Sequence, residues 1–363
     1  MGDGHSEDEL RAMAEKAMGA PVLDFGEHES AFGSSRKAYV ADTASGRAFL
    51  RCAVPGLGLE STMFTLRREA AILGRLSSAG LCVPRPLCVS DDGTVLVLEW
   101  LDGEVGPRGD RATRERLARS YAATILSLPD VDSDAVFGDE RTSAPTIAAA
   151  VEVELQRWRA IATPSFLADP LGGGLLYWLD ENRARDTSPS VIVHGDAGHG
   201  NFMVVDDRIT GFIDWEMSHL GDPFEDLACM QMRSLNRDAG VWSDALRSFY
   251  RDGGVTPDRA RVGWERAHVL VRSAIAMRRS LEQGNEGRSH APFARYESEN
   301  LFLSLVEVAK LAADQVAAPP DDLAGLLREA LRRCADNGSP SSRLVDAGFA
   351  FAYPEVDRDA RTR

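Results

Sequence analysis

The chain has 363 residues, of which 44% are hydrophobic and 27% charged, a composition typical of a soluble globular protein. It is long enough to bury a substantial core, and no apolar run approaches the roughly 20 residues that a membrane-spanning helix needs. The formal charge of −15 argues against a nucleic-acid-binding surface, and five cysteines without C-x-x-C spacing argue against a disulfide framework or a structural zinc site.

The first residues contain a helix-start motif. Ser6 and Glu9 have the spacing of a capping box, in which each side chain satisfies an open backbone N–H of the other, so a helix is predicted to run to about Met18. No positively charged segment followed by an apolar core precedes it. We therefore expect a cytoplasmic protein without a membrane partner.

The stretch from Val22 to Trp100 is predicted to form a small α+β lobe. Apolar residues recur at three- and four-residue spacing between positions 60 and 78, which indicates a helix with one buried face. β-rich runs bounded by Asp- and Gly-containing turns indicate two hairpins around this helix. The predicted strands cover residues 36–41, 47–54, 87–90 and 94–100.

Helical patterns dominate beyond Gly103, so the second lobe is predicted to be larger and mainly helical. The candidate helices cover residues 111–128, 146–162 and 175–185, with several more after Pro223. One β island interrupts them, comprising residues 190–193, 202–205 and 208–213. The residues after position 337 are rich in Gly, Ser, Pro and charge, and we expect a loosely held extension there.

The most informative residues stand at the edges of this β island. In the segment His194-Gly-Asp196-Ala-Gly-His-Gly-Asn201, the aspartate precedes the asparagine by five positions, as in the kinase catalytic loop H-R-D-x-x-x-x-N. A later strand leads into Asp214. Phosphoryl transfer needs a carboxylate that faces the hydroxyl and oxygen ligands that hold Mg²⁺, so these residue types in this order indicate an ATP-dependent kinase.

These motifs, with Ile-Asp214-Trp-Glu and Gly-Asp-Pro-x-x-Asp226-Leu-Ala, resemble those of the aminoglycoside phosphotransferase and choline kinase-like family. The resemblance implies a bilobal, protein-kinase-like α+β fold. It implies that Asp196 is the catalytic base or orients the hydroxyl, and that Asn201 and Asp214 coordinate Mg²⁺. His194 would shape the loop, and Asp226 would start a core helix and brace the loop.

The same resemblance assigns phosphate-binding roles in the small lobe. Ser34 and Ser35 occupy the place of the phosphate-covering loop, although the motif G-x-G-x-x-G is missing. Arg51 stands where the family carries its ATP-phosphate lysine, and Lys37, one strand earlier, is an alternative source of positive charge. Glu69 would orient this cation.

A hinge between the lobes is implied at the end of the second hairpin. Backbone atoms of Glu99, Trp100 and Leu101 would hydrogen-bond adenine there. The expected organisation is a nucleotide-binding lobe at residues 1–102, a catalytic and substrate-binding lobe at 103–336 and an extension at 337–363.

The function implied is transfer of the ATP γ-phosphate to a hydroxyl of a small molecule, with ATP and Mg²⁺ required and no nucleic-acid partner. The sequence of residues 213–223 resembles that of kinase domains associated with acyl-CoA dehydrogenases. This resemblance favours a hydroxylated catabolic intermediate, such as a hydroxyacyl-CoA, as the phosphate acceptor. An aminoglycoside-like antibiotic is the other acceptor considered.

Two alternatives remain. A metal-dependent phosphoesterase could use the H-x-D pair of His194 and Asp196, but the seven histidines of the chain show no second cluster of metal-ligand type. A non-catalytic, kinase-like nucleotide-binding protein is suggested by Arg51 and by the missing glycine loop. However, Asp196, Asn201 and Asp214 are all present.

Overall fold

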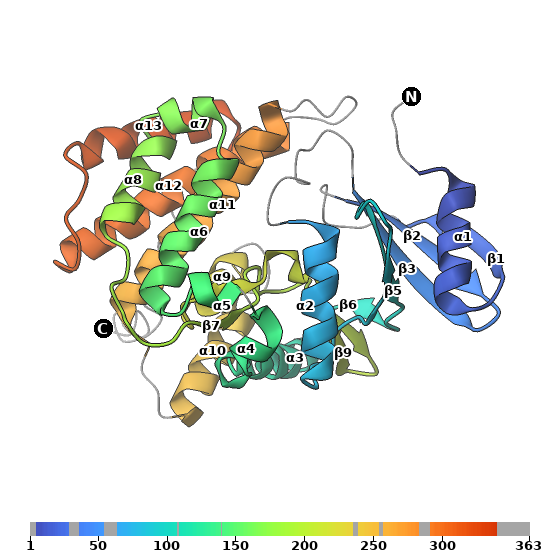
Figure 1. Ribbon diagram of the computed structural model, residues 1–363. Helices are drawn as coiled ribbons and strands as arrows, with labels where there is room; N and C mark the ends of the chain where they lie inside the picture. The colour runs from blue at the N-terminus through green and yellow to red at the C-terminus, as the bar shows by residue number, and fades with distance from the viewer. Residues whose placement is uncertain are drawn as a thin grey trace.

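The computed structural model describes residues 5–28, 36–53, 64–106, 109–138, 140–234, 239–253, 257–282 and 291–339. It contains a β-rich N-terminal lobe and a larger helical lobe (Figure 1). In the part of the chain so described, no helix is long and apolar enough to cross a membrane.

The N-terminal lobe is built on a five-stranded antiparallel sheet with the strand order β1-β2-β3-β5-β4. The strands are β1 Val22–Glu27, β2 Arg36–Thr43, β3 Gly46–Ala53, β4 Pro86–Val89 and β5 Val95–Glu99. Both predicted hairpins are confirmed. The first one turns more tightly than expected, because β2 continues to Thr43 and β3 already begins at Gly46.

One helix covers each face of this sheet. The alternation of side chains along β5 directs Val95 and Val97 into a cluster with helix α1 (Glu7–Met18), whereas Leu96 and Leu98 pack in the core that includes helix α2 (Leu66–Ser78). Figure 1 shows the two helices on opposite sides of the sheet. One face of the sheet therefore packs on α1, and the β4 and β5 part of the other face packs on α2.

The predicted N-terminal helix is confirmed with its capping box. The Ser6 hydroxyl accepts the Glu9 N–H, and the Glu9 carboxylate accepts the Ser6 N–H. Gly19 ends the helix in the left-handed conformation at φ 65°, where a glycine carries no Cβ penalty.

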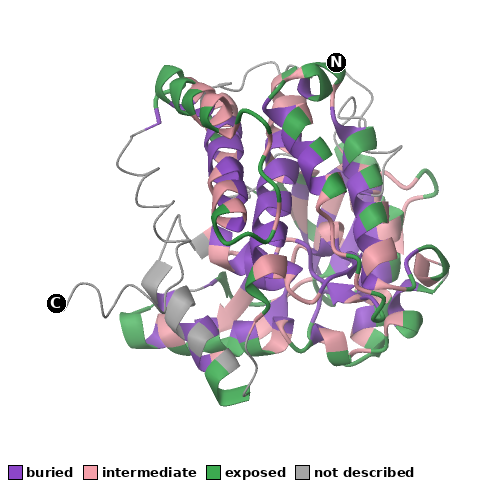
Figure 2. Cartoon of the chain, turned by 90° about the vertical axis from the view of Figure 1, so that its left-hand side faces the viewer, coloured by how far each residue is buried: buried purple, intermediate pink, exposed green. Residues whose placement is uncertain are grey.

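The second lobe is mainly helical, and its long helices α11 and α12 pack against each other. Figure 2 shows that many residues along the helices of the molecule are buried. The α-helices are α3 Arg111–Ile125, α4 Ser133–Phe137, α5 Glu140–Ser143, α6 Ile147–Ile161, α7 Pro164–Ala168, α8 Gly172–Glu181, α9 Glu225–Ser234, α10 Ala239–Gly253, α11 Arg259–Glu282, α12 Ala291–Ala313 and α13 Leu323–Asp336. Helix α8 starts three residues earlier than predicted. Its first turn consists of three consecutive glycines, which are poor helix formers, so the sequence pattern did not indicate a helix there.

The predicted β island is divided between two small sheets. Strand β7 (Val191–Val193) pairs with β10 (His219–Gly221), which the sequence pattern did not indicate. Strands β8 (Phe202–Val205) and β9 (Arg208–Phe212) form a hairpin joined by β6 (Glu104–Val105). Two short 3-10 helices complete the lobe, η1 Leu128–Asp130 and η2 Trp215–Met217.

Candidate active site

The loop between β7 and β8 is hydrogen-bonded to the first turn of helix α9. The Asp226 carboxylate accepts the backbone N–H groups of His194 at 2.8 Å and Gly195 at 3.0 Å. Burial and the neighbouring Glu225 raise the pKa of Asp226 to about 7. Asp226 thus satisfies two buried donors in the position that the sequence suggested for a brace.

His194 connects this loop to the strand that leads into Asp214. Its Nε2 lies 3.1 Å from the Ile213 carbonyl, and its ring centroid lies 4.5 Å from that of Trp215. Burial lowers the pKa of His194 to about 4, so the ring is neutral near pH 7. The Ile213 N–H also donates to the Asn201 carbonyl at 3.0 Å. The loop and the strand β9 therefore form one structural unit.

Asp196 and Asn201 lie side by side in the loop. The Asn201 amide donates to the Asp196 carboxylate at 3.0 Å and to its backbone carbonyl at 2.6 Å. About a third of the Asp196 side chain is exposed, which leaves it accessible to a substrate hydroxyl. The backbone conformation of the loop thus brings the two predicted residues into contact.

A residue that the sequence reasoning missed, Arg233 on α9, holds both of them. Its guanidinium forms an ion pair with the Asp196 carboxylate and lies 3.4 Å from the Asn201 amide oxygen. Arg233 is one of the causes that lower the pKa of Asp196 against the opposing effect of burial. Arg233 follows Asp226 by seven positions, which places both on one face of α9, so helical periodicity could have identified it.

Asp214 lies two residues after the end of strand β9 and immediately before η2, in a left-handed backbone conformation, φ 69° and ψ 54°. No hydrogen bond to its carboxylate is found among the described residues, and 41% of the side chain is exposed. Desolvation in the site and the neighbouring carboxylate of Glu216 raise the pKa of Asp214 to about 7. The positive charge near the carboxylate is therefore too weak to offset the effects that raise its pKa.

Arg51 reaches this group of carboxylates from strand β3. It forms an ion pair with Glu69 of helix α2, and its Nη2 lies 2.8 Å from Glu216 and 3.8 Å from Asp214. Glu69 is only 3% exposed, and its second carboxylate oxygen has no hydrogen-bond partner. The structure thus brings Arg51, Glu69 and Asp214 together and adds Glu216, which stands in the Ile-Asp-Trp-Glu motif but received no role from the sequence.

The alternative cation, Lys37, lies on the other face of the sheet. It is paired directly with Cys52, whose side chain belongs to the cluster under α1, whereas Arg51 is paired with Ala38. Residues opposite each other in an antiparallel pair share a face, so Lys37 points away from Glu69 and Asp214. Ser34 and Ser35 lie outside the described residues.

The predicted hinge follows the end of β5. The Glu99 N–H donates to the Arg85 carbonyl at 2.9 Å, and the Trp100 indole donates to Asp102 at 3.0 Å. The Leu101 side chain lies against Gly211 of β9, where a Cβ would meet it. The hinge therefore contacts the strand that leads into Asp214.

An aromatic group beside the hinge was not anticipated from the sequence. Phe49 lies two residues before Arg51 on β3 and hence on the same face, and its ring centroid is 6.3 Å from Trp100 and 5.6 Å from His28. The two-residue alternation along β3 was the signal that could have identified Phe49.

The arrangement fits a hard divalent cation. The carboxylates of Glu69, Asp196, Asp214 and Glu216 face two arginines, and the raised pKa of Asp214 reflects this excess of negative charge. Carboxylate and amide oxygens are the ligand types that Mg²⁺ prefers. In the described part of the chain, the only cluster of His, Cys, Asp and Glu with metal-ligand spacing is Glu225, Glu265 and His268, so His194 has no partner for the dinuclear hydrolase site considered above.

Comparison with known proteins places this geometry in context. A family model described as "Phosphotransferase enzyme family" matches residues 31–264. Acyl-CoA dehydrogenase family member 10 of Mus musculus is 26% identical over 212 residues, which are 54% of this chain and 19% of that protein. The chain therefore spans about a fifth of the length of this relative.

Solved structures of two kinds share the fold. The choline kinase LicA from Streptococcus pneumoniae matches with a TM-score of 0.58 and 14% identity, over 83% of this chain and 99% of that one. The aminoglycoside-3'-phosphotransferase of type VIII matches with a TM-score of 0.54 and 23% identity, over 73% and 98%. The expected bilobal, kinase-like fold is thereby confirmed.

Proposed function

Because this chain belongs to the phosphotransferase enzyme family, we propose that it transfers the γ-phosphate of ATP to a hydroxyl group of a small molecule. The observation that carries this proposal is that Arg51 of the sheet lies close to Asp214 and Glu216. The segment with these two carboxylates is joined through His194 to the loop that contains Asp196. A phosphate-binding cation, metal-binding oxygens and a carboxylate for the acceptor are the parts that phosphoryl transfer requires.

Asp196 is the residue assigned to the acceptor hydroxyl. Its partly exposed carboxylate would accept a hydrogen bond from the hydroxyl and orient it toward the phosphorus, taking the proton as the new oxygen–phosphorus bond forms. Arg233 and Asn201 hold the carboxylate from the protein side. Their hydrogen bonds favour the ionised form, which is the form able to accept the proton.

The small lobe is assigned to the nucleotide. Arg51 would bind phosphate oxygens through its guanidinium, and Glu69 would fix its orientation from α2. Phe49 and Trp100, beside the predicted hinge Glu99 to Leu101, offer aromatic surface for a nucleobase. We accordingly propose residues 1–102 as the nucleotide-binding lobe, 103–336 as the catalytic and substrate-binding lobe and 337–363 as an extension.

Asn201 and Asp214 would hold Mg²⁺, and Glu216 is a third oxygen donor within the same group. When bound, the cation would neutralise negative charge on the phosphates. The raised pKa of Asp214 supports this assignment, because a nearby cation would stabilise its ionised form.

For the acceptor we propose a hydroxylated catabolic intermediate such as a hydroxyacyl-CoA. This acceptor is supported by the similarity to acyl-CoA dehydrogenase family member 10 and by the sequence of residues 213–223. An aminoglycoside-like antibiotic ranks second, since the solved aminoglycoside phosphotransferase contributes only its fold.

The test is ADP release from MgATP in the presence of hydroxyacyl-CoAs, aminoglycosides, amino alcohols and sugars. We expect stimulation by one class and loss of that stimulation in Asp196→Asn. Release of phosphate from phosphate esters without ATP would support the phosphoesterase instead. MgATP binding without stimulation by any acceptor class would support the non-catalytic alternative.

A further inference from the structure

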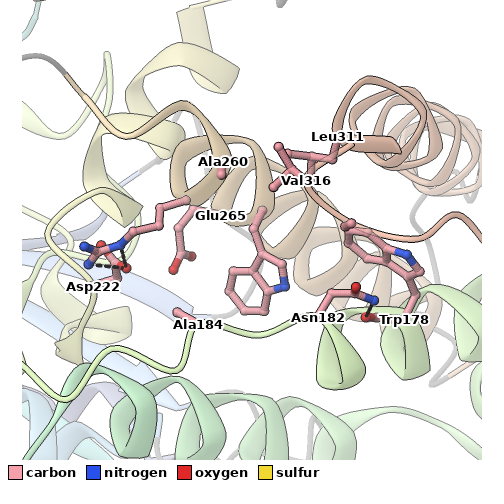
Figure 3. A pocket seen from close by; sticks show the side chains of 11 residues that line it. Trp178, Asn182, Ala184, Asp222, Ala260, Glu265, Leu311 and Val316 are labelled. Carbon is pink, nitrogen blue, oxygen red and sulfur yellow. Dashed lines mark hydrogen bonds and ion pairs between the residues drawn. The ribbon is translucent and has the colours of Figure 1, made fainter. Parts of the chain in front are cut away.

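The helical lobe contains a pocket to which none of the site residues named above contributes. Its volume is about 180 Å³, several times the roughly 30 Å³ that a water molecule occupies in the liquid. Residues of α8, α11 and the segment after α12 line it, and none of them belongs to the loop from His194 to Asn201 or to the segment around Asp214. Figure 3 shows Leu311 and Val316 on one side of the pocket and Ala184 on the opposite side.

Two tryptophans form rigid walls of this pocket. The Trp264 indole donates to the Leu179 carbonyl at 3.2 Å, and the Trp178 indole donates to the Ala318 carbonyl at 2.7 Å. Both indole N–H groups are therefore occupied by backbone acceptors. What the two side chains offer to a ligand is aromatic carbon surface, which attracts cations through its negative face.

The polar feature of the pocket is a buried carboxyl group. Glu265 is 1% exposed, and the only hydrogen bond that the described residues offer its carboxylate comes from His268 Nδ1 at 3.2 Å. Figure 3 shows the carboxylate pointing away from Ala260 and toward Ala184. Burial and the nearby carboxylates of Glu225 and Asp222 raise the pKa of Glu265 well above its usual range, against the opposing effect of Arg272 and Arg261. A cation bound beside the carboxylate would stabilise its ionised form.

The two arginines near Glu265 are already paired, Arg272 with Glu225 and Arg261 with two other carboxylates. Arg261 lies 2.7 Å from Asp222 and 3.0 Å from Asp186, so one positive charge stands between two negative ones. The His268 ring is neutral near pH 7, since burial and Arg272 lower its pKa to about 4. With Glu265 ionised, the lining and its immediate partners carry a net negative charge, and an anionic ligand is disfavoured.

We propose that this pocket binds a small organic ammonium ion, with the charged nitrogen at Glu265 and the alkyl groups against Trp178 and Trp264. A carboxylate combined with aromatic walls is the chemistry that recognises such ions. An inorganic metal ion at the neighbouring group of Glu225, Glu265 and His268 fits less well. Both oxygens of Glu225 are already engaged, by Arg272 and by His219 at 3.0 Å, so Glu225 has no free oxygen for a metal.

The pocket also adjoins the support of the catalytic loop. Glu225 has its carboxylate within 4.8 Å of the Glu265 and His268 ligand atoms, and it pairs with Arg272, which donates to the Gly195 carbonyl. A cation at Glu265 would therefore act on the electrostatics of this ion pair, which makes the pocket a candidate effector site.

The experiment is calorimetric titration of the full chain with tetramethylammonium and with putrescine, in the absence of ATP and at constant ionic strength. Neither probe has a hydroxyl group that could accept phosphate, and dependence of binding on Glu265 distinguishes this pocket from an acceptor site at Asp196. We expect saturable binding of at least one probe to one site, and at least tenfold weaker binding in Glu265→Gln. Glu152→Gln, an exposed carboxylate outside the pocket, should bind as the unaltered protein does.

A second variant protects the test against misfolding of Glu265→Gln. Val316 is 51% exposed at the pocket, so Val316→Arg should fold, place a positive charge at the entrance and weaken binding. Absence of binding by both probes, binding that neither variant weakens, or displacement of the probes by millimolar Mg²⁺ would each overturn the proposal. Because no turnover is measured, failure here leaves the kinase assignment untouched, and the reverse also holds.

Discussion

Arg51 Nη2 and the Glu216 carboxylate lie 2.8 Å apart, although 165 residues separate them in the chain. The other end of the same guanidinium pairs with Glu69. A planar group with donors on two edges can bridge two carboxylates, which a lysine ammonium on a flexible stem does less well. This difference gives the arginine a structural reason to stand where the resembling family carries a lysine.

Arg51→Lys should therefore impair nucleotide binding even though the charge is kept. Loss of one charge-assisted hydrogen bond costs about 1.5–3 kcal/mol, so we expect the KM for ATP to rise by about tenfold or more. Steady-state kinetics over a range of ATP concentrations would measure this. Lys37→Ala, on the opposite face of the sheet, is the control and should leave the KM within about twofold; the reverse ranking would contradict the assignment.

Asp196→Asn should abolish most turnover while preserving the shape of the loop. General-base catalysis contributes roughly 10²- to 10⁴-fold, and kcat should fall by a factor in this range. Binding of MgATP, measured by calorimetry, should change little. The exposed Asp321→Asn provides a matched control, and near-normal kcat in Asp196→Asn would remove the assigned role.

Mg²⁺ affinity should increase with pH. The pKa of Asp214 is raised to about 7 by desolvation and Glu216, so below pH 7 a metal must displace a proton from it. Between pH 6 and 7 the affinity should rise by at most about tenfold, and it should level off above pH 7. Calorimetric Mg²⁺ titrations of the intact chain would measure this. Asp214→Asn should bind weakly at every pH, and a pH-independent affinity in the unaltered protein would refute the idea.

Arg233→Gln should shift the acid limb of the pH–rate profile. Arg233 favours the ionised form of Asp196, so its removal should raise the pKa of that carboxyl. The loss of kcat/KM on acidification should then begin at higher pH than in the unaltered enzyme, with a lower plateau. A variant that lost activity with no shift of the limb would indicate that Arg233 acts only on loop structure.

Asp226→Ala should lower the free energy of unfolding. It would leave the backbone N–H groups of His194 and Gly195 buried without their acceptor. We expect the free energy of unfolding to fall by about 2–6 kcal/mol, at about 1–3 kcal/mol for each of the two unsatisfied groups. Urea denaturation followed by circular dichroism would measure the change. Asp321→Ala is the control, and an equal effect in both variants would argue against a bracing role.

Much of the local architecture could be predicted because its causes are local. The capping box of Ser6 and Glu9, the hairpins of the N-terminal lobe and the helix that contains Glu69 depend on neighbouring residues and on periodicity. Asp196 and Asn201 could also be picked out as candidates, because both stand in one short loop motif, and the structure brings them into contact there. Strand β10 escaped prediction because three residues carry too little periodic signal.

The sequence by itself determined the kind of chemistry, since the order of Asp196, Asn201 and Asp214 is contained in two short motifs. Only the tertiary structure decided which cations serve them. The pairing of β2 with β3 turned Lys37 toward α1 and Arg51 toward Glu69, and the packing of α9 brought Arg233 onto Asp196. The physical reason is that ion pairs between distant segments depend on strand register and helix packing, which a local pattern of residues does not encode.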